Sequence, residues 1–387
     1  MKILHIITSL KIGGAESSLY NLLQEFIKDK NDYHFVIYFH DGPNAEKIRK
    51  LGIPIFKNEG FLHKYDPYAY FKLKKLIKQI NPNLIHSALW SANILARLIA
   101  KKLNIPIICD LHSNISYDGL FRTWLEKYFL YKADKYIAVS NSAMSGFYNS
   151  VILKEKNPIK RKIATNKLSL IYNGIDTKKT QTFNVKIEKT DYGINKNDFV
   201  FGSVGRLEPI KSYDLLIKSF HLLINKTKCS AKLCIIGNGS QKSKLQKLTT
   251  RLNINNQVIF LGEKNNAYKY YTLFNCFIIS SKSEGLSIAL LEALSFGLPI
   301  ITTHNNQIHE AIKNGQNGLL VPTENKVALA KAMEKLCMNH KLCKNIKQNN
   351  LKLVKTKFNI YKTKKSYLEL YYKIAQNSTC NQQIKFN

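Results

Sequence analysis

Short apolar runs alternate with longer helical patterns along the whole chain. The first run, 3–8, is followed by Gly13-Gly14 and then by apolar residues at every third or fourth position up to residue 27. A short apolar run is typical of a buried strand, and the spacing after it is typical of an amphipathic helix. Further strands are expected at 34–39, 84–86, 106–110, 136–140 and 168–172, with helices at 67–79, 92–102 and 124–132.

A polar stretch, about 176–198, interrupts this alternation and is interpreted as an interdomain linker. After it the same pattern restarts. Strands are expected at 199–204, 232–237, 257–261, 276–280, 299–303 and 318–321, with helices such as 213–223 and 287–295 between them. Strands that alternate with helices indicate βαβ units and a parallel sheet.

The predicted fold is therefore α/β, with two Rossmann-like doubly wound domains that face a central cleft. A length of 387 residues suits two domains. We expect an N-terminal Rossmann-like domain at 1–185, a C-terminal Rossmann-like domain at 190–365, and a C-terminal helix and tail at 366–387 that could cross back to the first domain. Ligands of such sheets gather at the carboxyl ends of the strands, so the cleft is the expected ligand site.

The charge of the chain is strongly positive, with 59 Lys and Arg against 26 Asp and Glu. This balance favours a partner of negative charge, such as nucleic acid, an anionic membrane surface or a phosphorylated substrate. A joint excess of Lys, Asn and Ile is also what an AT-rich genome produces on any protein surface, and this explanation accounts for part of the charge. The lysines are spread out and no nucleic-acid-binding motif accompanies them, so nucleic acid is not an expected partner.

The seven cysteines are an odd number and lie mostly inside apolar segments, which indicates small buried residues in a reducing compartment. Cys337, His340 and Cys343 are close in sequence, but no second ligand pair lies near them, so no metal site is expected. No run of about 18 apolar residues occurs, and the apolar N-terminus has no signal-peptide cleavage site. We expect a cytoplasmic protein, peripheral on the inner face of the cytoplasmic membrane.

Two carboxylates eight residues apart carry the most informative chemistry. Glu284 lies in the turn after an apolar strand, and a helix that starts near Leu286 places Glu292 inside apolar sequence. The start of this helix offers free N–H groups and a positive dipole end, which suit an anion. At about 1.5 Å of rise per residue, Glu292 would stand roughly 9 Å along the axis, so the two carboxylates could contact different parts of one elongated ligand. The alternative, two surface carboxylates, is weakened because a buried unpaired carboxylate is costly.

The segment 283–300 resembles the E-x7-E signature of the retaining glycosyltransferases of the GT-B fold, glycosyltransferase family 4 (glycosyl transferases group 1). Further landmarks of that family match in order: 7–10 with 13–16, Val139-Ser140, 173–176, 203–207 with Lys211, Gly237-Asn238-Gly239 and 258–262. The resemblance implies transfer of a sugar from a UDP- or GDP-linked donor without a metal or other cofactor. It covers most of the chain, and it implies that the domain at 1–185 binds the acceptor and the domain at 190–365 binds the nucleotide sugar.

The resemblance also implies roles for individual residues. Arg206 and Lys211 would bind the donor diphosphate and stabilise charge on the leaving group, because two fixed cations can replace a metal there. Glu284 would contact the transferred sugar and Glu292 the ribose hydroxyls, while Gly14 would allow close backbone approach from the opposite domain. The phosphate site would be completed at the start of the helix that carries Glu292, by Gly285, Leu286, Ser287 and Ile288.

His112 matches a family histidine near the sugar, and the resemblance implies that it supports charge and positions the sugar, with Asp110 orienting it. The alternative is a structural histidine. Two positions depart from the family pattern: Leu286-Ser287 stands where Phe-Gly is common, and Ser212 where glycine is common. The first departure leaves the sugar pocket open, and the base contacts are expected from backbone near Gly262.

Basic and aromatic residues at 65–78, and a second basic run at 154–167, fit docking on an anionic membrane that presents a lipid-linked acceptor. A solvated helix face is the alternative. The expected role is the assembly of cell-envelope polysaccharide, lipopolysaccharide or capsule, on a glycan or lipid-linked acceptor. Other functions left open are a transferase or phosphorylase acting on a soluble sugar and a non-catalytic nucleotide-sugar or glycan-binding protein. A Rossmann oxidoreductase is not expected, because Gly13-Gly14 after the first strand does not supply the glycine fingerprint of that class.

Overall fold

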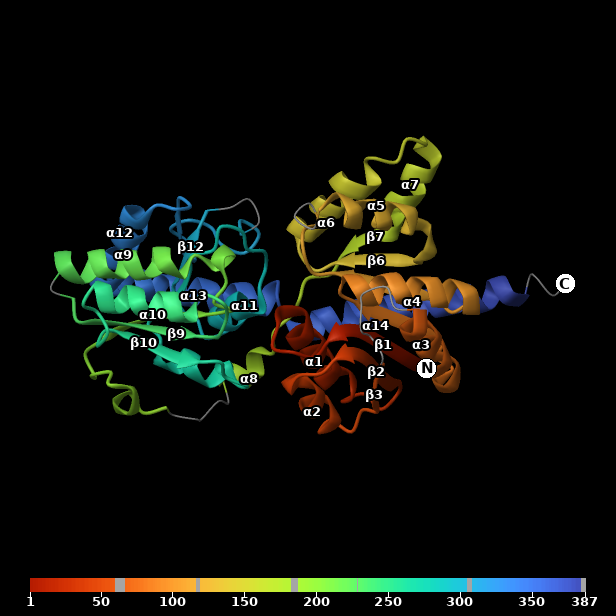
Figure 1. Cartoon of the computed structure of the whole chain (residues 1–387), viewed down its shortest axis with the longest axis horizontal. Helices are drawn as coiled ribbons and strands as arrows, with labels where there is room; N and C mark the ends of the chain where they lie inside the picture. Colours follow the sequence, from red (N-terminus) through yellow and green to blue (C-terminus); the bar gives the residue numbers. More distant parts are fainter. Residues whose placement is uncertain (60–66, 116–118, 182–186, 228, 305–307, 384–387) are drawn as a thin grey trace. The chain divides into compact units, whose positions relative to one another are not determined.

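The computed structural model describes residues 1–59, 67–115, 119–181, 187–227, 229–304 and 308–383. Residues 65–66 of the basic aromatic stretch, 182–186 of the expected linker, and 384–387 lie outside this range, as does the side chain of Cys380. The chain forms two compact units (Figure 1). Unit 1 comprises Met1–Gly174 and Ile360–Asn387, and unit 2 comprises Ile175–Asn359.

Unit 1 is built on a parallel sheet of seven strands within the described residues, in the order β3-β2-β1-β4-β5-β6-β7. The six expected strands are confirmed, with ends that differ from the expected ones by at most two residues. The short strand β3 is additional, and three residues are too few to show a periodic pattern. The strands are β1 (Lys2–Ser9), β2 (Tyr33–His40), β3 (Ile55–Lys57), β4 (Leu84–Ala88), β5 (Ile107–Leu111), β6 (Lys135–Ala138) and β7 (Leu168–Leu170).

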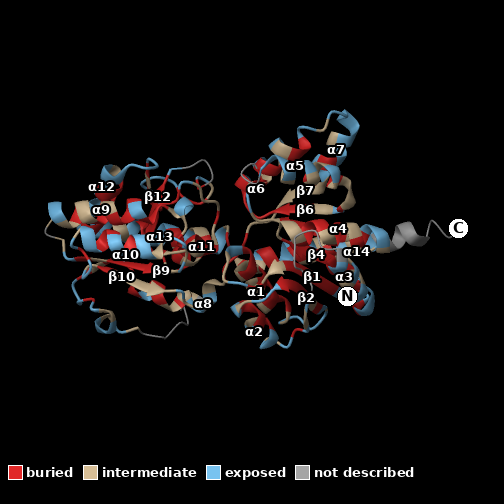
Figure 2. Ribbon diagram, viewed as in Figure 1, coloured by how far each residue is buried: buried red, intermediate tan, exposed pale blue. Residues whose placement is uncertain are grey.

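Helices cover both faces of this sheet, as in a doubly wound fold. One apolar core joins the sheet to α1 and α14, and a second joins its other face to α3, α4 and η3. Each core is lined by buried aliphatic and aromatic side chains, and the ribbon of buried residues is red in Figure 2. The helices are α1 (Gly14–Phe26), α2 (Pro43–Arg49), α3 (Pro67–Ile80), α4 (Trp90–Leu103), α5 (Leu120–Tyr128), η2 (Leu130–Lys132), α6 (Asn141–Phe147), η3 (Tyr148–Ile152), α7 (Pro158–Lys167) and α14 (Ile360–Gln383).

The C-terminal helix α14 packs on unit 1 although it follows unit 2 in sequence. Its start lies against Gly174, where an added Cβ would stand 2.5 Å from the Ile360 Cα. Thr363 Oγ1 donates to the Tyr172 carbonyl oxygen at 2.9 Å. Close backbone contact therefore accounts for the glycine in the 173–176 landmark. The units meet in sequence at 174–175 and 359–360, whereas composition placed these boundaries near 185 and 365.

Unit 2 contains a second parallel sheet, of six strands among the described residues, in the order β10-β9-β8-β11-β12-β13. All six expected strands are present. The polar stretch 176–198 is not an extended linker throughout, because it contains α8 (Thr177–Gln181) and the 3-10 helix η4 (Lys189–Tyr192). The strands are β8 (Phe199–Val204), β9 (Ala231–Ile236), β10 (Val258–Gly262), β11 (Cys276–Ile279), β12 (Ile300–Thr303) and β13 (Leu319–Val321).

The helices of unit 2 pack around this sheet, and α9 and α12 are in mutual contact. They enclose one apolar core, which includes Phe201 and Phe220. The remaining helices of the unit are η5 (Pro209–Lys211), α9 (Tyr213–Lys226), α10 (Lys242–Arg251), η6 (Ala267–Leu273), α11 (Ile288–Ser295), α12 (Lys326–Met338) and α13 (His340–Thr356).

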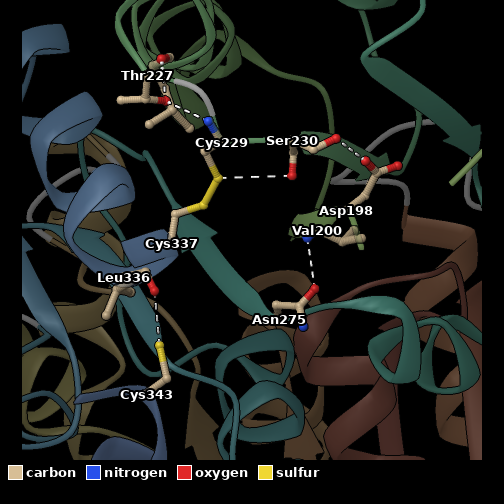
Figure 3. The surroundings of a disulfide bond; sticks show 10 residues. Asp198, Val200, Thr227, Cys229, Ser230, Asn275, Leu336, Cys337 and Cys343 are labelled. Atoms are coloured by element: carbon tan, nitrogen blue, oxygen red, sulfur yellow. Dashed lines mark hydrogen bonds between the residues drawn. A yellow bond between two sulfur atoms is a disulfide. The ribbon is translucent and has the colours of Figure 1, made fainter. Parts of the chain in front are cut away.

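A disulfide joins Cys229, just before β9, to Cys337 at the end of α12 (Figure 3). The expectation that all cysteines are reduced is therefore wrong for this pair. The two residues are 108 positions apart in sequence, so only the packing of unit 2 brings them together. Cys109, Cys234 and Cys276 are free and buried, as expected. Cys343 is also free, and its Sγ donates to the Leu336 carbonyl oxygen at 3.2 Å.

Candidate active site

The loop after β8 carries Arg206 and is fixed by a close contact between two backbone segments. Gly237 has a φ of 143°, and an added Cβ there would stand 1.9 Å from the Gly205 carbonyl oxygen. A Cβ on Gly239 would approach the Leu207 carbonyl oxygen to 2.6 Å, and the Leu207 N–H donates to the Asn238 carbonyl at 2.9 Å. Gly237-Asn238-Gly239 is thus required by this contact, which leaves Arg206 exposed at the end of the strand.

Lys211 and Glu284 form an ion pair, although 73 positions separate them in sequence. Lys211 ends η5, and its carbonyl oxygen accepts from the Ser280 hydroxyl at 2.8 Å. Ser281 Oγ donates to the same carboxylate oxygen of Glu284 that binds Lys211, at 2.9 Å. The two side chains are 22% and 10% exposed. A cation and a carboxylate therefore stand together, partly shielded from water, where the loops after β8 and β11 meet.

Helix α11 begins just after this pair, at Ile288. Ser287 is its N-cap, and its hydroxyl accepts from the Leu290 N–H at 3.4 Å. The Ser287 N–H itself donates to the Gly285 carbonyl oxygen at 2.9 Å, within the turn. Leu286 is buried. The two residues that depart from the family pattern therefore have structural roles here, one as a cap and one as a packing residue.

Glu292 is held by a residue that the sequence analysis missed. Tyr271, in η6, donates its hydroxyl to Glu292 Oε2 at 2.9 Å and approaches the Ala289 carbonyl oxygen at 3.1 Å. Burial, reinforced by the nearby Glu292 charge, raises the pKa of Tyr271 well above its usual value, so the hydroxyl stays a donor. Tyr271 lies in a tyrosine-rich 3-10 segment without clear periodicity, so no sequence pattern distinguishes it from its neighbours.

At the start of α1 the glycine in close contact with another residue is Gly13, whereas Gly14 was the one expected. A Cβ on Gly13 would stand 2.3 Å from Oε2 of Glu16, a buried carboxylate that also accepts from the Ser9 hydroxyl. A Cβ on Gly14 would meet nothing within 4 Å. Within unit 1 the close contact is therefore between Gly13 and the Glu16 carboxylate, and a role of Gly14 toward unit 2 stays a prediction.

His112 directly follows β5 and lies beside a small pocket at the carboxyl ends of β4 and β5. Its Nε2 is 3.8 Å from Asp110 Oδ2. Burial lowers the pKa of His112, and the Asp110 charge opposes this shift, so the imidazole is neutral near pH 7. The polar residues that line the pocket are Ser18, His86, Asp110, His112, Thr363 and Tyr367.

Asp110 is the end of a buried chain of histidines that the sequence did not reveal. Its Oδ2 accepts from the Tyr367 hydroxyl at 2.8 Å and lies 2.9 Å from His86 Nε2. His86 Nδ1 lies 3.2 Å from His5 Nδ1, and His5 Nε2 lies 3.1 Å from His34 Nδ1. The parallel pairing of β1 with β4 and with β2 places these rings side by side. When each imidazole donates to the next, the hydrogen bonds of this chain run from His34 through His5 and His86 toward Asp110.

We expect this chain of histidines to make unit 1 sensitive to acid. Burial, with help from the N-terminal ammonium, His86 and Lys364 and against the opposing Asp32, lowers the pKa of His34 from 6.5 to about 4. Because the unfolded state then takes up the proton first, stability is complete above pH 6.5 and is lost as the pH falls toward 4. Between pH 7.5 and 5 the loss from His34 is about 2 kcal/mol in the free energy of unfolding.

Urea unfolding followed by tryptophan fluorescence at both pH values measures this loss. His34→Gln keeps a donor toward His5 and should shrink the pH dependence by that amount, whereas exposed His340→Gln should leave it unchanged. An unchanged pH dependence in His34→Gln would contradict the assignment.

The described residues were expected to contain neither a metal site nor a membrane-spanning helix. Within those residues, no group of three or more His, Cys, Asp or Glu side chains is arranged to hold a metal ion. Across the same part of the chain, no helix has the length and apolar character needed to cross a membrane.

Residues 12–179 match the family model Glycosyltransferase Family 4, and residues 184–353 match the model Glycosyl transferases group 1. The chain is 32% identical to an uncharacterised glycosyltransferase of Methanocaldococcus jannaschii over 66% of its own length and 62% of the relative's. It is 26% identical to an α-1,4-N-acetyl-D-galactosaminyltransferase of Campylobacter jejuni whose name includes a PP-undecaprenol-linked glycan, over 96% of this chain and 98% of that one.

The fold is that of known GT-B glycosyltransferases. The crystal structure of HepE from Anabaena in complex with UDP-glucose superposes with a TM-score of 0.81, at 20% identity, over 96% of this chain and 100% of that one. The two family models match both halves of the chain, and the fold is shared with GT-B glycosyltransferases. Together these findings support the assignment of the chain as a glycosyltransferase with two Rossmann-like domains.

Proposed function

We propose that the chain is a retaining glycosyltransferase that moves a sugar from a UDP- or GDP-sugar to a lipid-linked glycan of the cell envelope. The observation that carries the proposal is the pairing of Lys211 with Glu284 where the loops after β8 and β11 meet. A donor sugar nucleotide presents phosphates and sugar hydroxyls next to each other. An adjacent cation and carboxylate are the groups that would bind these two parts.

In this proposal the two cations act on the leaving group. The nucleotide diphosphate gains negative charge as the bond to the sugar breaks, and Lys211 with the exposed Arg206 would stabilise that charge. When the donor binds, Lys211 would exchange part of its contact with Glu284 for phosphate. The start of α11, where the helix dipole is positive, would add to the phosphate site, and no metal would be needed.

The two carboxylates have different roles. Glu284, freed in part from Lys211, would accept hydroxyls of the transferred sugar. Glu292 would accept the vicinal hydroxyls of the ribose, with Tyr271 holding one of its oxygens and so fixing the direction of the carboxylate. A carboxylate that is held in this way loses less conformational freedom when it binds a diol. Base contacts would come from backbone near Gly262.

On unit 1, neutral His112 would position the sugar and support its developing charge, with Asp110 orienting the imidazole. The PP-undecaprenol glycan in the name of the Campylobacter relative supports a lipid-linked acceptor. An anionic membrane would present such an acceptor. Helix α3 exposes Tyr68 and Phe71 together with Lys75 and Lys78, and α7 exposes Lys160 and Lys162. These residues support a peripheral position on the inner face of the cytoplasmic membrane.

Release of nucleotide diphosphate from a panel of UDP-, GDP- and ADP-sugars tests the proposal. We expect one UDP- or GDP-sugar to turn over, with retention at the anomeric carbon of the product and with the same rate in excess EDTA. Turnover that stops in EDTA would refute the metal-independent mechanism. Binding of a sugar nucleotide without turnover on any lipid-linked or soluble acceptor would favour a non-catalytic binding protein, and no binding at all would refute the donor site.

A further inference from the structure

Helix α5 has an inverted distribution of polar and apolar residues. Among its residues Glu126 alone is buried, whereas Phe121, Trp124 and Tyr128 are 57%, 59% and 66% exposed. The three exposed rings form a stack along one side of the helix, with centroids 6.3 Å and 5.9 Å apart. A helix of a globular protein normally turns such side chains toward the core. The aromatic stack is therefore not explained by the packing of unit 1.

A buried polar contact helps to hold α5 on unit 1. Glu126 Oε2 lies 2.7 Å from Arg97 Nη2, and both side chains are almost completely buried. Arg97 Nη1 donates to the Tyr136 hydroxyl, also at 2.7 Å. Because this network fixes the inner side of the helix, the exposed aromatic stack is free to be changed without removing the contacts that hold α5 in place.

Basic residues surround the aromatic stack. Lys127 Nζ donates to the Lys154 carbonyl oxygen at 2.9 Å, and α5 and α7 both pack against η3. Helix α7, drawn mostly in the pale blue of exposed residues in Figure 2, adds exposed Ile159 and Ile163. Segment 120–128 has two basic residues and segment 153–163 has five, against one acidic residue in each. Of these acids, Glu126 is buried and Glu155 accepts from the Tyr131 hydroxyl.

We infer that this surface, called here the α5–α7 face and comprising residues 120–128 and 153–163, docks on an anionic lipid bilayer. Exposed aromatic rings are favoured at the boundary between head groups and acyl chains, and Lys side chains reach lipid phosphates from there. The charge complements an anionic surface, to which each basic residue is attracted. The inference rests on the proposed lipid-linked acceptor. It assigns insertion into the bilayer to α5, which lies outside the basic stretches 65–78 and 154–167.

The two tryptophans of the chain make insertion directly measurable. They are Trp90 and Trp124. In a Trp90→Phe variant of the full chain, Trp124 is the only fluorescent tryptophan. With vesicles of phosphatidylcholine and phosphatidylglycerol at low salt, we expect its emission to shift to the blue and to be quenched by lipids brominated on the acyl chains. Vesicles of phosphatidylcholine alone should give at least tenfold weaker binding. Unchanged emission with anionic vesicles would overturn the inference.

Co-sedimentation with the same vesicles tests the aromatic stack itself. The triple variant Phe121→Ser, Trp124→Ser and Tyr128→Ser should bind at least tenfold more weakly than the parent chain. The matched control, Tyr33→Ser with Met338→Ser, removes two apolar side chains that are 69% and 65% exposed outside α3, α5 and α7, and it should lower binding less than threefold. Equal binding by the triple variant and the parent would overturn the assignment to α5, as would a loss in the control as large as in the triple variant. A dimer of the parent in light scattering that the triple variant abolishes would also overturn it, in favour of a protein partner.

Failure of this inference is distinguishable from failure of the proposed function. Titration with UDP and GDP, and hydrolysis of the donor sugar nucleotide in the absence of lipid, depend on unit 2 residues far from α5 in sequence. We expect the triple variant to match the parent in both measurements and to lose transfer only to an acceptor embedded in vesicles. Loss of nucleotide binding in the parent chain would refute the donor site and leave the vesicle result standing.

Discussion

Replacing Lys211 with alanine should lower kcat for sugar transfer by about a thousandfold, which corresponds to about 4 kcal/mol of lost transition-state stabilisation. The charge on the leaving diphosphate develops as the bond to the sugar breaks, so a cation that binds it contributes more to the transition state than to the ground state. The substitution also removes the cation that pairs with the Glu284 carboxylate, whereas the hydrogen bond from the Ser281 hydroxyl to that carboxylate stays. Release of nucleotide diphosphate measures kcat, and donor titration measures the smaller change in affinity.

Lys282 provides the matched control for this substitution. It lies in the same loop region as Glu284, but its ammonium is about half exposed and pairs with the exposed Glu324 at 2.6 Å. We expect Lys282→Ala to keep kcat within a factor of three, because an exposed ion pair contributes little. Lys211→Arg should recover part of the lost rate, since it restores charge but changes the geometry of the contact. A kcat for Lys211→Ala close to that of the parent would refute the assigned role.

Replacing Glu126 with alanine should destabilise unit 1 by about 3–5 kcal/mol. The change removes the carboxylate that pairs with Arg97, whose side chain is fully buried. A guanidinium left in an apolar interior without a counter-charge is strongly unfavourable, because arginine does not lose its proton in proteins and the charge stays buried. Both tryptophans of the chain lie in unit 1, so tryptophan fluorescence during urea unfolding reports on this unit.

An exposed ion pair of the same unit serves as the control. Glu369 lies 3.9 Å from Lys365 on α14, and both side chains are more than two-thirds exposed. Glu369→Ala should change the free energy of unfolding by less than about 0.5 kcal/mol. In the double variant Arg97→Met with Glu126→Leu, the loss should be smaller than in Glu126→Ala alone, because apolar side chains then replace both charges. A loss in the double variant as large as in the single one would show that packing, rather than the unpaired charge, causes the effect.

The sequence by itself determined the fold class and the chemistry expected of unit 2. Strands and amphipathic helices of two parallel-sheet domains follow from hydrophobic periodicity, which is a local property of the chain. The landmarks around Glu284 and Arg206 are likewise contiguous motifs. The glycines of these motifs could be recognised from the sequence, but the sequence did not explain why glycine is needed at these positions. Gly237 and Gly174 are explained by close approach of segments that the sequence does not place together.

Only the tertiary structure decided which side chains meet across long sequence separations. Examples are the pairing of Lys211 with Glu284, the hydrogen bond from Tyr271 to Glu292, and the histidine chain that ends at Asp110. The disulfide and the outward-facing aromatic stack of α5 belong to the same class. Hydrophobic pattern reports which positions are buried on average. Strand order and helix packing determine which buried residues touch, and for that reason these contacts had no signal in the sequence alone.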